Sequence, residues 1–278
     1  VEMGASHPGD IKELVDIAEP NFGLITNVGH AHILGFGSFE GVVKTKGELY
    51  DFIRANGGKV FRNADNPNLA SIANGLDSVL YGKASTNYVY GKSLGAVPFL
   101  KVEWNGKAIQ TNLVGDYNFE NVLAAITVGT YFNVAADDVV AALEAYVPSN
   151  NRSQFKDTGK NHLIIDAYNA NPTSMAASLN NFLVMDVPNK MLILGDMKEL
   201  GQDSEMEHNK VIEWITANGF KSVCLVGDCF KAAAGGAFNT FNDVDELYAW
   251  LQANPVTGAN ILVKGSNSTK LIKVVDIL

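Results

Sequence analysis

Polar side chains that could bind a ligand follow an apolar run near the middle of the chain. Residues 162–165 predict a buried strand, and residues 172–185 predict a helix that begins at a proline. Between them stand Asp166, Tyr168, Asn169 and Asn171. Ligands bind at the carboxyl ends of strands in open α/β sheets, so this turn is a candidate site. The alternative is that these residues only shape a turn and cap a helix.

A second set of residues, Glu2, His32 and Lys46, could bind a metal. Glu2 and His32 each follow a predicted strand, and Lys46 lies in the next predicted helix. A carboxylate and an imidazole can ligate Mg²⁺ or Mn²⁺ where phosphate oxygens complete the coordination. Lys46 as a bare amine would repel the ion. The alternative is a surface glutamate, a histidine in a turn and a solvated lysine.

The first part of the chain alternates between helical and extended patterns. The spacing of apolar residues predicts helices over 10–18, 38–55 and 68–74 and strands over 22–28, 59–61 and 78–81. Such alternation predicts a parallel sheet. Residues 1–4 have the pattern of a strand's last residues running into a turn.

The pattern changes after residue 87. Apolar residues alternate with period two up to Val114, and Asn105-Gly106 predicts a hairpin turn. Two predicted helices follow, over 118–132 and 137–146. Residues 148–151 form a polar segment that begins with proline and predicts a linker. We therefore expect one domain over residues 1–149 and another over 150–278.

The second domain has a regular β/α pattern. Strands are predicted over 162–166, 190–195, 222–227 and 260–264, and helices over 172–185, 205–218, 243–253 and 268–277. Right-handed crossovers between such elements predict a doubly wound, Rossmann-like α/β domain. No G-x-G-x-x-G follows its first strand, which argues against a nicotinamide cofactor.

Composition limits the possible partners. The 278 residues carry a net charge of −9 without a basic stripe, which argues against nucleic acid as the main partner. No apolar run reaches the ~20 residues of a membrane span. Cys224 and Cys229 are too few for a disulfide framework, so we expect a cytoplasmic protein. We also expect a monomer.

Several motifs, in order along the chain, resemble the Mur ligase family. Those of the first domain are residues 1–6, 25–32, 36–38 and 46–49; those of the second are residues 166–172, 194–201 and 264–266. The Tyr-Asn-Ala-Asn-Pro run and the Gly-Asp-Met stretch are similar to the branch that joins D-alanyl-D-alanine to UDP-N-acetylmuramoyl-tripeptide. The resemblance implies a central ATPase domain that is truncated here, followed by the carboxy-terminal ligase domain.

The resemblance implies an ATP-dependent amide ligase of peptidoglycan synthesis. ATP would phosphorylate the substrate carboxylate, and the dipeptide amine would displace phosphate from the acyl phosphate. Glu2 and His32 match the metal-binding positions of the family, with Mg²⁺ or Mn²⁺ as the ion; His30 is not assigned to it. Lys46 matches a lysine that is carbamylated in several members, and carbamylation would remove its repulsion of the metal.

The resemblance also implies a nucleotide site between the domains. Asn118 and Asn121 match the residues that meet adenine, although Tyr117 stands where many members have histidine. Arg152 matches an arginine that reaches the phosphates. Asp166 matches an acid that contacts ribose, with Tyr168 and Asn169 near it. Residues expected to meet the dipeptide are Asn171, Lys264 and Ser266.

Two other functions stay open. The chain could be a sister amide ligase of the folylpolyglutamate or cyanophycin type, or a noncatalytic binding module with a ligase fold. Members of the family have a phosphate-binding loop, G-x-x-G-K-[ST], before the strand that ends at Glu2, and a domain that binds the uridine nucleotide before that loop. Neither the loop nor that domain occurs in these residues.

We predict that this polypeptide alone has little or no ligase activity. The loop's backbone N–H groups and lysine hold the β- and γ-phosphates, and nothing in the sequence replaces them. A ligase assay on the 278 residues checks this; turnover close to that of a full-length enzyme would contradict it.

Overall fold

The computed structural model describes residues 1–29 and 33–278 and divides into two compact units. The first unit comprises Val1–Gly95, Leu100–Thr111 and Asp116–Tyr146. The second comprises Ala96–Phe99, Asn112–Gly115 and Val147–Leu278. The domain boundary expected between residues 149 and 150 stays a prediction.

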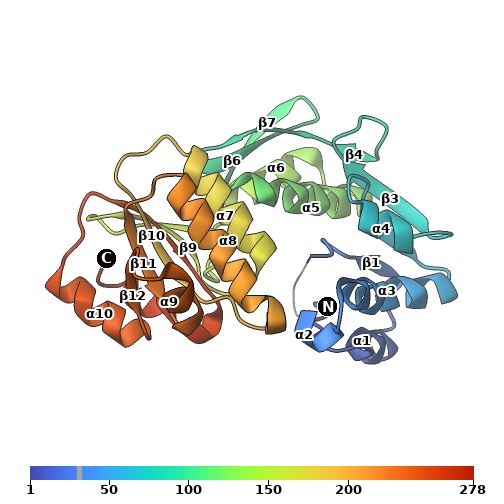
Figure 1. Ribbon diagram of the computed structural model, residues 1–278. Helices are drawn as coiled ribbons and strands as arrows, with labels where there is room; N and C mark the ends of the chain where they lie inside the picture. Colours follow the sequence, from blue (N-terminus) through green and yellow to red (C-terminus); the bar gives the residue numbers. More distant parts are fainter. Residues whose placement is uncertain (30–32) are drawn as a thin grey trace. The chain divides into compact units, whose positions relative to one another are not determined.

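The first unit is built on a four-stranded parallel sheet in the order β1-β2-β3-β4. Its strands are β1 (Phe22–Leu24), β2 (Lys59–Asn63), β3 (Asp77–Gly82) and β4 (Val89–Tyr90). Its helices are α1 (Asp10–Ala18), α2 (Ile33–Phe36), α3 (Phe39–Ala55), α4 (Pro67–Ile72), α5 (Phe119–Tyr131) and α6 (Ala136–Ala145), with a 3-10 turn η1 (Asp116–Asn118) before α5. Figure 1 shows α3 and α5 on opposite sides of this sheet.

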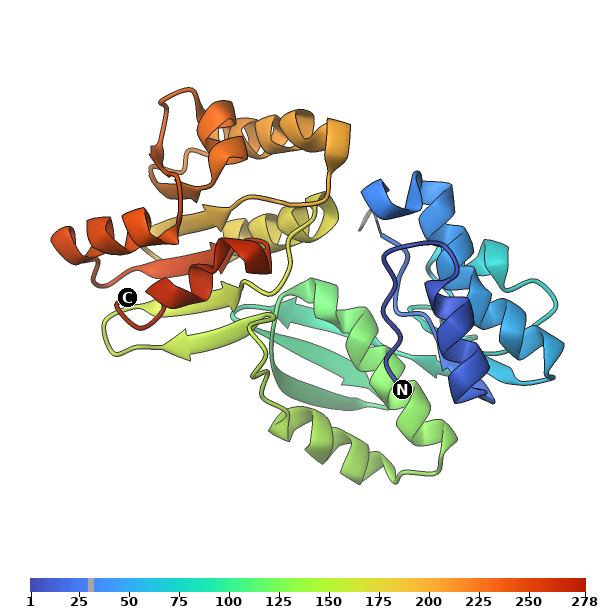
Figure 2. The same ribbon diagram turned by 90° about the horizontal axis from the view of Figure 1, so that it is seen from below.

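Buried apolar side chains explain why α3 lies on the sheet. Val42, Tyr50 and Ile53, on one face of the helix, are fully buried with Val60 of β2. Burial raises the pKa of the Tyr50 hydroxyl to about 12, so this phenol stays neutral. On the adjoining side α1 packs along α3 (Figure 2), where the Glu48 carboxylate accepts hydrogen bonds from two backbone N–H groups at the start of α1.

A three-stranded sheet, β5-β6-β7, follows β4. Its strands are β5 (Lys92–Ala96), β6 (Phe99–Trp104) and β7 (Lys107–Val114). Asn105 and Gly106 join β6 to β7 with φ values of 51° and 71°. Both residues in the left-handed region are typical of a two-residue hairpin turn, as the sequence predicts.

The second unit contains a six-stranded sheet in the order β12-β11-β10-β13-β9-β8. Its strands are β8 (Gln154–Asp157), β9 (His162–Asp166), β10 (Lys190–Gly195), β11 (Ser222–Val226), β12 (Asn239–Phe241) and β13 (Asn260–Lys264). All neighbours are parallel except β8 and β9. Its helices are α7 (Pro172–Val184), α8 (Ser204–Ala217), α9 (Asp228–Ala234) and α10 (Val244–Ala253), with 3-10 turns η2 (Gly201–Asp203), η3 (Asn267–Thr269) and η4 (Leu271–Val274).

Helices cover both faces of this sheet, which confirms the doubly wound fold. Alternate strand residues enter two separate cores: Ile164 packs with α7 and α8, whereas Leu163 and Ile165 pack with α10 and η4. Figure 1 shows α7 and α8 together on one side. The polar side chains of β9, β10 and β13 therefore lie at the ends of these strands.

Several predicted elements are wrong in extent or kind. The predicted strand over 22–28 ends at Leu24, and Val1–Ala5 form no strand, because no described strand pairs with them. The predicted helix over 268–277 is two 3-10 turns, since Lys270 has a left-handed φ of 53°. Strands β8 and β12 and helix α9 were not predicted because each is short. None of the described helices is long and apolar enough to span a membrane.

Truncating the centre of this core tests its contribution to stability. Ile193 of β10 is fully buried, so Ile193→Ala should lower the free energy of unfolding by about 2–5 kcal/mol. Val184→Ala is the matched control: its side chain is 69% exposed, and we expect a change within ~0.5 kcal/mol. Urea unfolding followed by circular dichroism measures both, and equal effects would contradict the assignment of Ile193 to the core.

Candidate functional site

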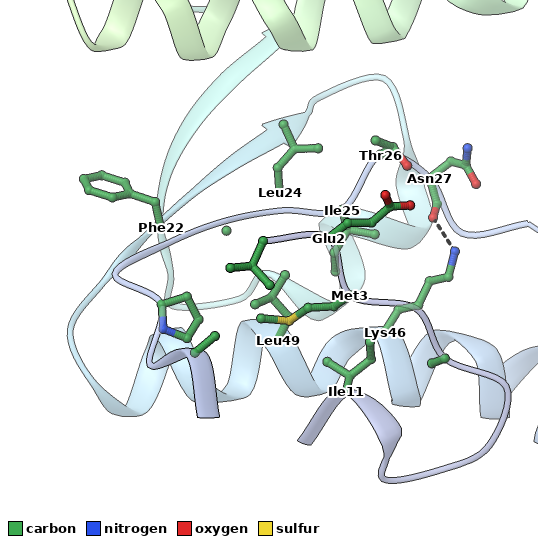
Figure 3. Close-up of a pocket in the computed structure, with 15 residues that line it drawn as sticks. Glu2, Met3, Ile11, Phe22, Leu24, Ile25, Thr26, Asn27, Lys46 and Leu49 are labelled. Carbon is green, nitrogen blue, oxygen red and sulfur yellow. Dashed lines mark hydrogen bonds between the residues drawn. The ribbon is translucent and has the colours of Figure 1, made fainter. Parts of the chain in front are cut away.

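A pocket of the first unit brings together Glu2 and Lys46. Its volume is ≈ 640 Å³, and it is lined by the amino-terminal segment, β1 with the residues after it, and α3. Figure 3 shows the Glu2 carboxylate, the Thr26 hydroxyl and the Lys46 amine at the same end of the pocket. His32, the third predicted metal ligand, lies outside the described residues.

The Lys46 amine lies in a partly buried site that disfavours its protonated form. Its Nζ donates a hydrogen bond to the Asn27 carbonyl oxygen at 3.1 Å, the dashed line in Figure 3. Burial lowers the pKa of this amine, because desolvation disfavours the ammonium. A larger neutral fraction favours reaction with carbon dioxide, since only the unprotonated amine is a nucleophile. The exposed Glu2 carboxylate is the ligand type that Mg²⁺ prefers.

Asn118 and Asn121 are neighbours at the start of α5. Asn118 ends the 3-10 turn η1, and its Oδ1 accepts a hydrogen bond from Asn121 Nδ2 at 3.1 Å. Asn118 is buried and Asn121 is exposed. An amide offers both a donor and an acceptor, which is what the edge of an adenine base requires.

Arg152 and Tyr168 are brought together in the second unit, although fifteen residues separate them in the sequence. The guanidinium carbon lies 3.9 Å from the centre of the tyrosine ring, a close cation–π contact. Tyr168 and Arg152 are both exposed, so both side chains can be reached from solvent. The pair therefore forms a cationic and aromatic surface beside the end of β9.

Asp166 and Lys264 form a buried ion pair at the ends of β9 and β13. Lys264 Nζ donates to Asp166 Oδ2 at 2.6 Å and to the Asn169 carbonyl oxygen at 3.3 Å. The Lys264 side chain is only 1% exposed. A direct contact between Lys264 and an incoming dipeptide would require this pair to open, so that role stays a prediction.

The remaining predicted residues stabilise the loop between β9 and α7. Asn171 caps α7 in a reciprocal capping box with Ser174, and Asn169 Oδ1 accepts a hydrogen bond from the Ala170 N–H. Ser266 Oγ accepts a hydrogen bond from the Lys198 N–H at 3.0 Å. Ser266 Oγ also donates a hydrogen bond to the Ala170 carbonyl oxygen at 3.4 Å, which ties it to this loop. Ligand binding by the three residues stays a prediction.

Comparison with known proteins identifies the family. Residues 1–129 match the sequence model of the Mur ligase middle domain, and residues 151–267 match that of the Mur ligase, glutamate ligase domain. The chain belongs to the Mur ligase family. The family resemblance predicted from the motifs is thereby confirmed.

Two relatives of this Mur ligase chain carry the same name. It is 31% identical over 296 residues to the UDP-N-acetylmuramoyl-tripeptide--D-alanyl-D-alanine ligase of Escherichia coli, covering 100% of this chain and 64% of the relative. The ligase of that name from Haemophilus influenzae is 30% identical over 295 residues, covering 99% of this chain and 63% of the relative. The chain thus spans less than two thirds of the length of these relatives.

Solved structures agree with the fold. A crystal structure of MurF from Acinetobacter baumannii has a TM-score of 0.83 and 25% identity, covering 98% of this chain and 62% of that one. MurF from Thermotoga maritima in complex with ADP has a TM-score of 0.85 and 22% identity, covering 99% of this chain and 65% of that one. The second likeness supports the fold alone.

The Mur ligase chain also contains a buried polar network around Asp196, directly after β10. Asp196 is fully buried, and its carboxylate accepts hydrogen bonds from the N–H groups of Cys229 and Phe230 and from Lys198 Nζ. Gly227 has a φ of 114°, and a Cβ there would lie 2.3 Å from the Asp196 carboxyl carbon. The Gly-Asp-Met motif is visible in the sequence, but no local pattern assigns a role to its aspartate.

His208 completes this network as a neutral imidazole. Its Nδ1 lies 2.7 Å from the Ser204 carbonyl oxygen and therefore donates, so Nε2 accepts from the Met197 N–H at 3.1 Å. Burial lowers its pKa, since desolvation disfavours the imidazolium. The ligand atoms of Asp196, His208 and Cys229 are within 4.8 Å of one another, but backbone N–H groups already occupy the first two. The cluster is therefore a structural network and not a metal site.

His208 should make the fold sensitive to acid. His208 binds a proton near pH 6.5 in the unfolded chain and only at lower pH in the folded chain. The contribution of neutral His208 to stability is therefore present above pH 6.5 and is lost as the pH falls below that value. The loss approaches about 1.4 kcal/mol per pH unit. Between pH 7.5 and 5.5, the free energy of unfolding should fall less steeply with decreasing pH for His208→Gln than for the wild type. The control His162→Gln, at an exposed histidine, should keep the original slope; if His208→Gln also keeps it, His208 is not the group responsible.

Proposed function

We propose that the protein to which this chain belongs is an ATP-dependent ligase that joins D-alanyl-D-alanine to UDP-N-acetylmuramoyl-tripeptide. The observation that carries the proposal is the alignment of nearly the whole chain, at about 30% identity, with ligases of that name. The placement of Glu2 and Lys46 in one pocket, and of Asp166 at a strand end, supports it.

The reaction has two steps in this proposal. An oxygen of the tripeptide carboxylate bonds to the γ-phosphorus of ATP and ADP leaves, which gives an acyl phosphate. The dipeptide amine then attacks the acyl carbon, loses a proton, and phosphate leaves as the amide forms. Each unit contributes groups of its own: the first offers Glu2, Lys46 and the two asparagines of α5, and the second offers the polar end of β9.

The residues present fit a divalent cation if Lys46 is carbamylated. An ammonium beside Glu2 would repel Mg²⁺, whereas a carbamate supplies a second anionic oxygen ligand. Glu2, carbamylated Lys46 and His32 would then hold the ion. When bound, Mg²⁺ neutralises the negative charge of the phosphates during phosphoryl transfer.

Substrate dependence tests the proposed activity. The native full-length protein should release phosphate from ATP only when UDP-N-acetylmuramoyl-tripeptide and D-alanyl-D-alanine are both present, and mass spectrometry should detect the pentapeptide product. Phosphate release that instead requires a folate and L-glutamate would contradict the proposal and indicate a sister ligase.

Replacing Lys46 tests the carbamate. Lys46→Ala in the full-length protein should lower kcat at least about 100-fold, the upper end of what a change beside a metal ligand costs. The control Lys44→Ala, at an exposed lysine of the same helix, should retain activity. Carbon-13 NMR in ¹³C-bicarbonate should show a carbamate resonance that Lys46→Ala abolishes. A wild-type protein that is fully active but shows no carbamate resonance in ¹³C-bicarbonate would rule out the carbamate.

A further inference from the structure

The ion pair between Lys264 and Asp166 is fixed by the pairing of two strands. Asp166 is the last residue of β9 and Lys264 the last residue of β13, and they are direct partners in the parallel register. Their side chains are 13% and 1% exposed. The carboxylate therefore keeps a small opening to solvent, whereas the amine has almost none.

Both described donors to this carboxylate use the same oxygen. Lys264 Nζ donates to Asp166 Oδ2 at 2.6 Å, and Ser178 Oγ of α7 donates to it at 2.8 Å. Lys264 also donates to the carbonyl oxygen of Asn169. Oδ1 of Asp166 has no hydrogen-bond partner among residues 1–29 and 33–278. Two donors from different elements prevent the carboxylate from rotating and leave Oδ1 as its available acceptor.

A lysine this deeply buried cannot itself reach a ligand without leaving its partner. It can act through Asp166, because a charged donor holds one carboxylate oxygen and the fixed rotamer sets the direction of the other. An anionic acceptor with one open oxygen suits a pair of neighbouring hydroxyl groups, such as the ribose diol of a nucleotide.

We propose that Lys264 and Ser178 are positioning residues that hold Asp166 so that its Oδ1 accepts hydrogen bonds from the ribose hydroxyls of the nucleotide. This role rests on the proposed function and on the ribose contact that the family resemblance implies for Asp166. It differs from the dipeptide contact expected from the sequence, since the lysine acts on the nucleotide and through another side chain.

The test compares a nucleotide that has the diol with one that lacks it. Isothermal titration of the native full-length protein with ADP and with 2′,3′-dideoxy-ADP gives two dissociation constants. The wild type should prefer ADP by at least about tenfold, the value of hydrogen bonds to a charged acceptor. Lys264→Met should weaken ADP binding by a similar factor, leave binding of the dideoxy nucleotide within about twofold, and so abolish the preference.

A variant with a smaller structural effect keeps the test informative if Lys264→Met fails to fold. Ser178→Ala removes one hydroxyl and should reduce the preference for ADP by about threefold to tenfold. Lys156→Met is the matched control, because Lys156 pairs with Asp276 at the surface of the same unit. It should leave both dissociation constants unchanged.

The outcomes separate this role from the proposed function. A wild type that binds neither nucleotide, or binds both equally, overturns the ribose contact and with it the role of Lys264. A wild type that prefers ADP, combined with variants that keep the full preference, overturns only the positioning role. Equal weakening of both nucleotides by Lys264→Met and Ser178→Ala would also overturn it, because that pattern indicates a structural role alone.

Discussion

The in-register parallel pairing of β9, β13 and β10 sets where polar groups can lie in the second unit. Lys264 is the register partner of both Asp166 and Leu194, so β9 and β13 end at the same level and β10 ends one residue further on, at Gly195. Helices bury both faces of the sheet, so the polar side chains carried by these three strands lie at their ends. A shift of one residue in this register would separate Lys264 from Asp166 and turn each strand's side chains to the opposite core.

Charged and neutral polar groups can be buried in the second unit because each of them has partners. Lys264, Asp196 and His208 are all fully buried, yet each takes part in at least two described polar contacts. An unpaired charge in such a position would cost several kcal/mol. Cys224 has no partner of this kind among the residues that the structure describes. Burial raises the pKa of its thiol to about 12, which makes it an inert part of the core at neutral pH.

The first unit also buries a lysine amine, that of Lys46, but without an ion pair among the described residues like the one between Lys264 and Asp166. Its pocket is mostly apolar, and the Lys46 amine has one described acceptor, the Asn27 carbonyl oxygen. Burial disfavours the ammonium there and lowers its pKa, which increases the neutral fraction of the amine. The two lysines therefore suit different roles. Lys264, held by a carboxylate, can position another group, whereas the desolvated Lys46 is suited to chemical modification.

Local patterns in the sequence were enough to predict most of the long helices and buried strands and the family of this protein. Apolar periodicity placed α1, α3, α7, β9, β10 and β13 to within a residue, because those elements are long or continuously buried. The motifs alone identified the family, since each is a short run of neighbouring residues. Short elements such as β8, β12 and α9 carry too few residues to show a period. The turns η3 and η4 replaced a helix because Lys270 adopts a left-handed conformation that no local pattern indicates. Only the tertiary structure paired Lys264 with Asp166 and set His208 against Met197, since these contacts depend on strand register and helix packing.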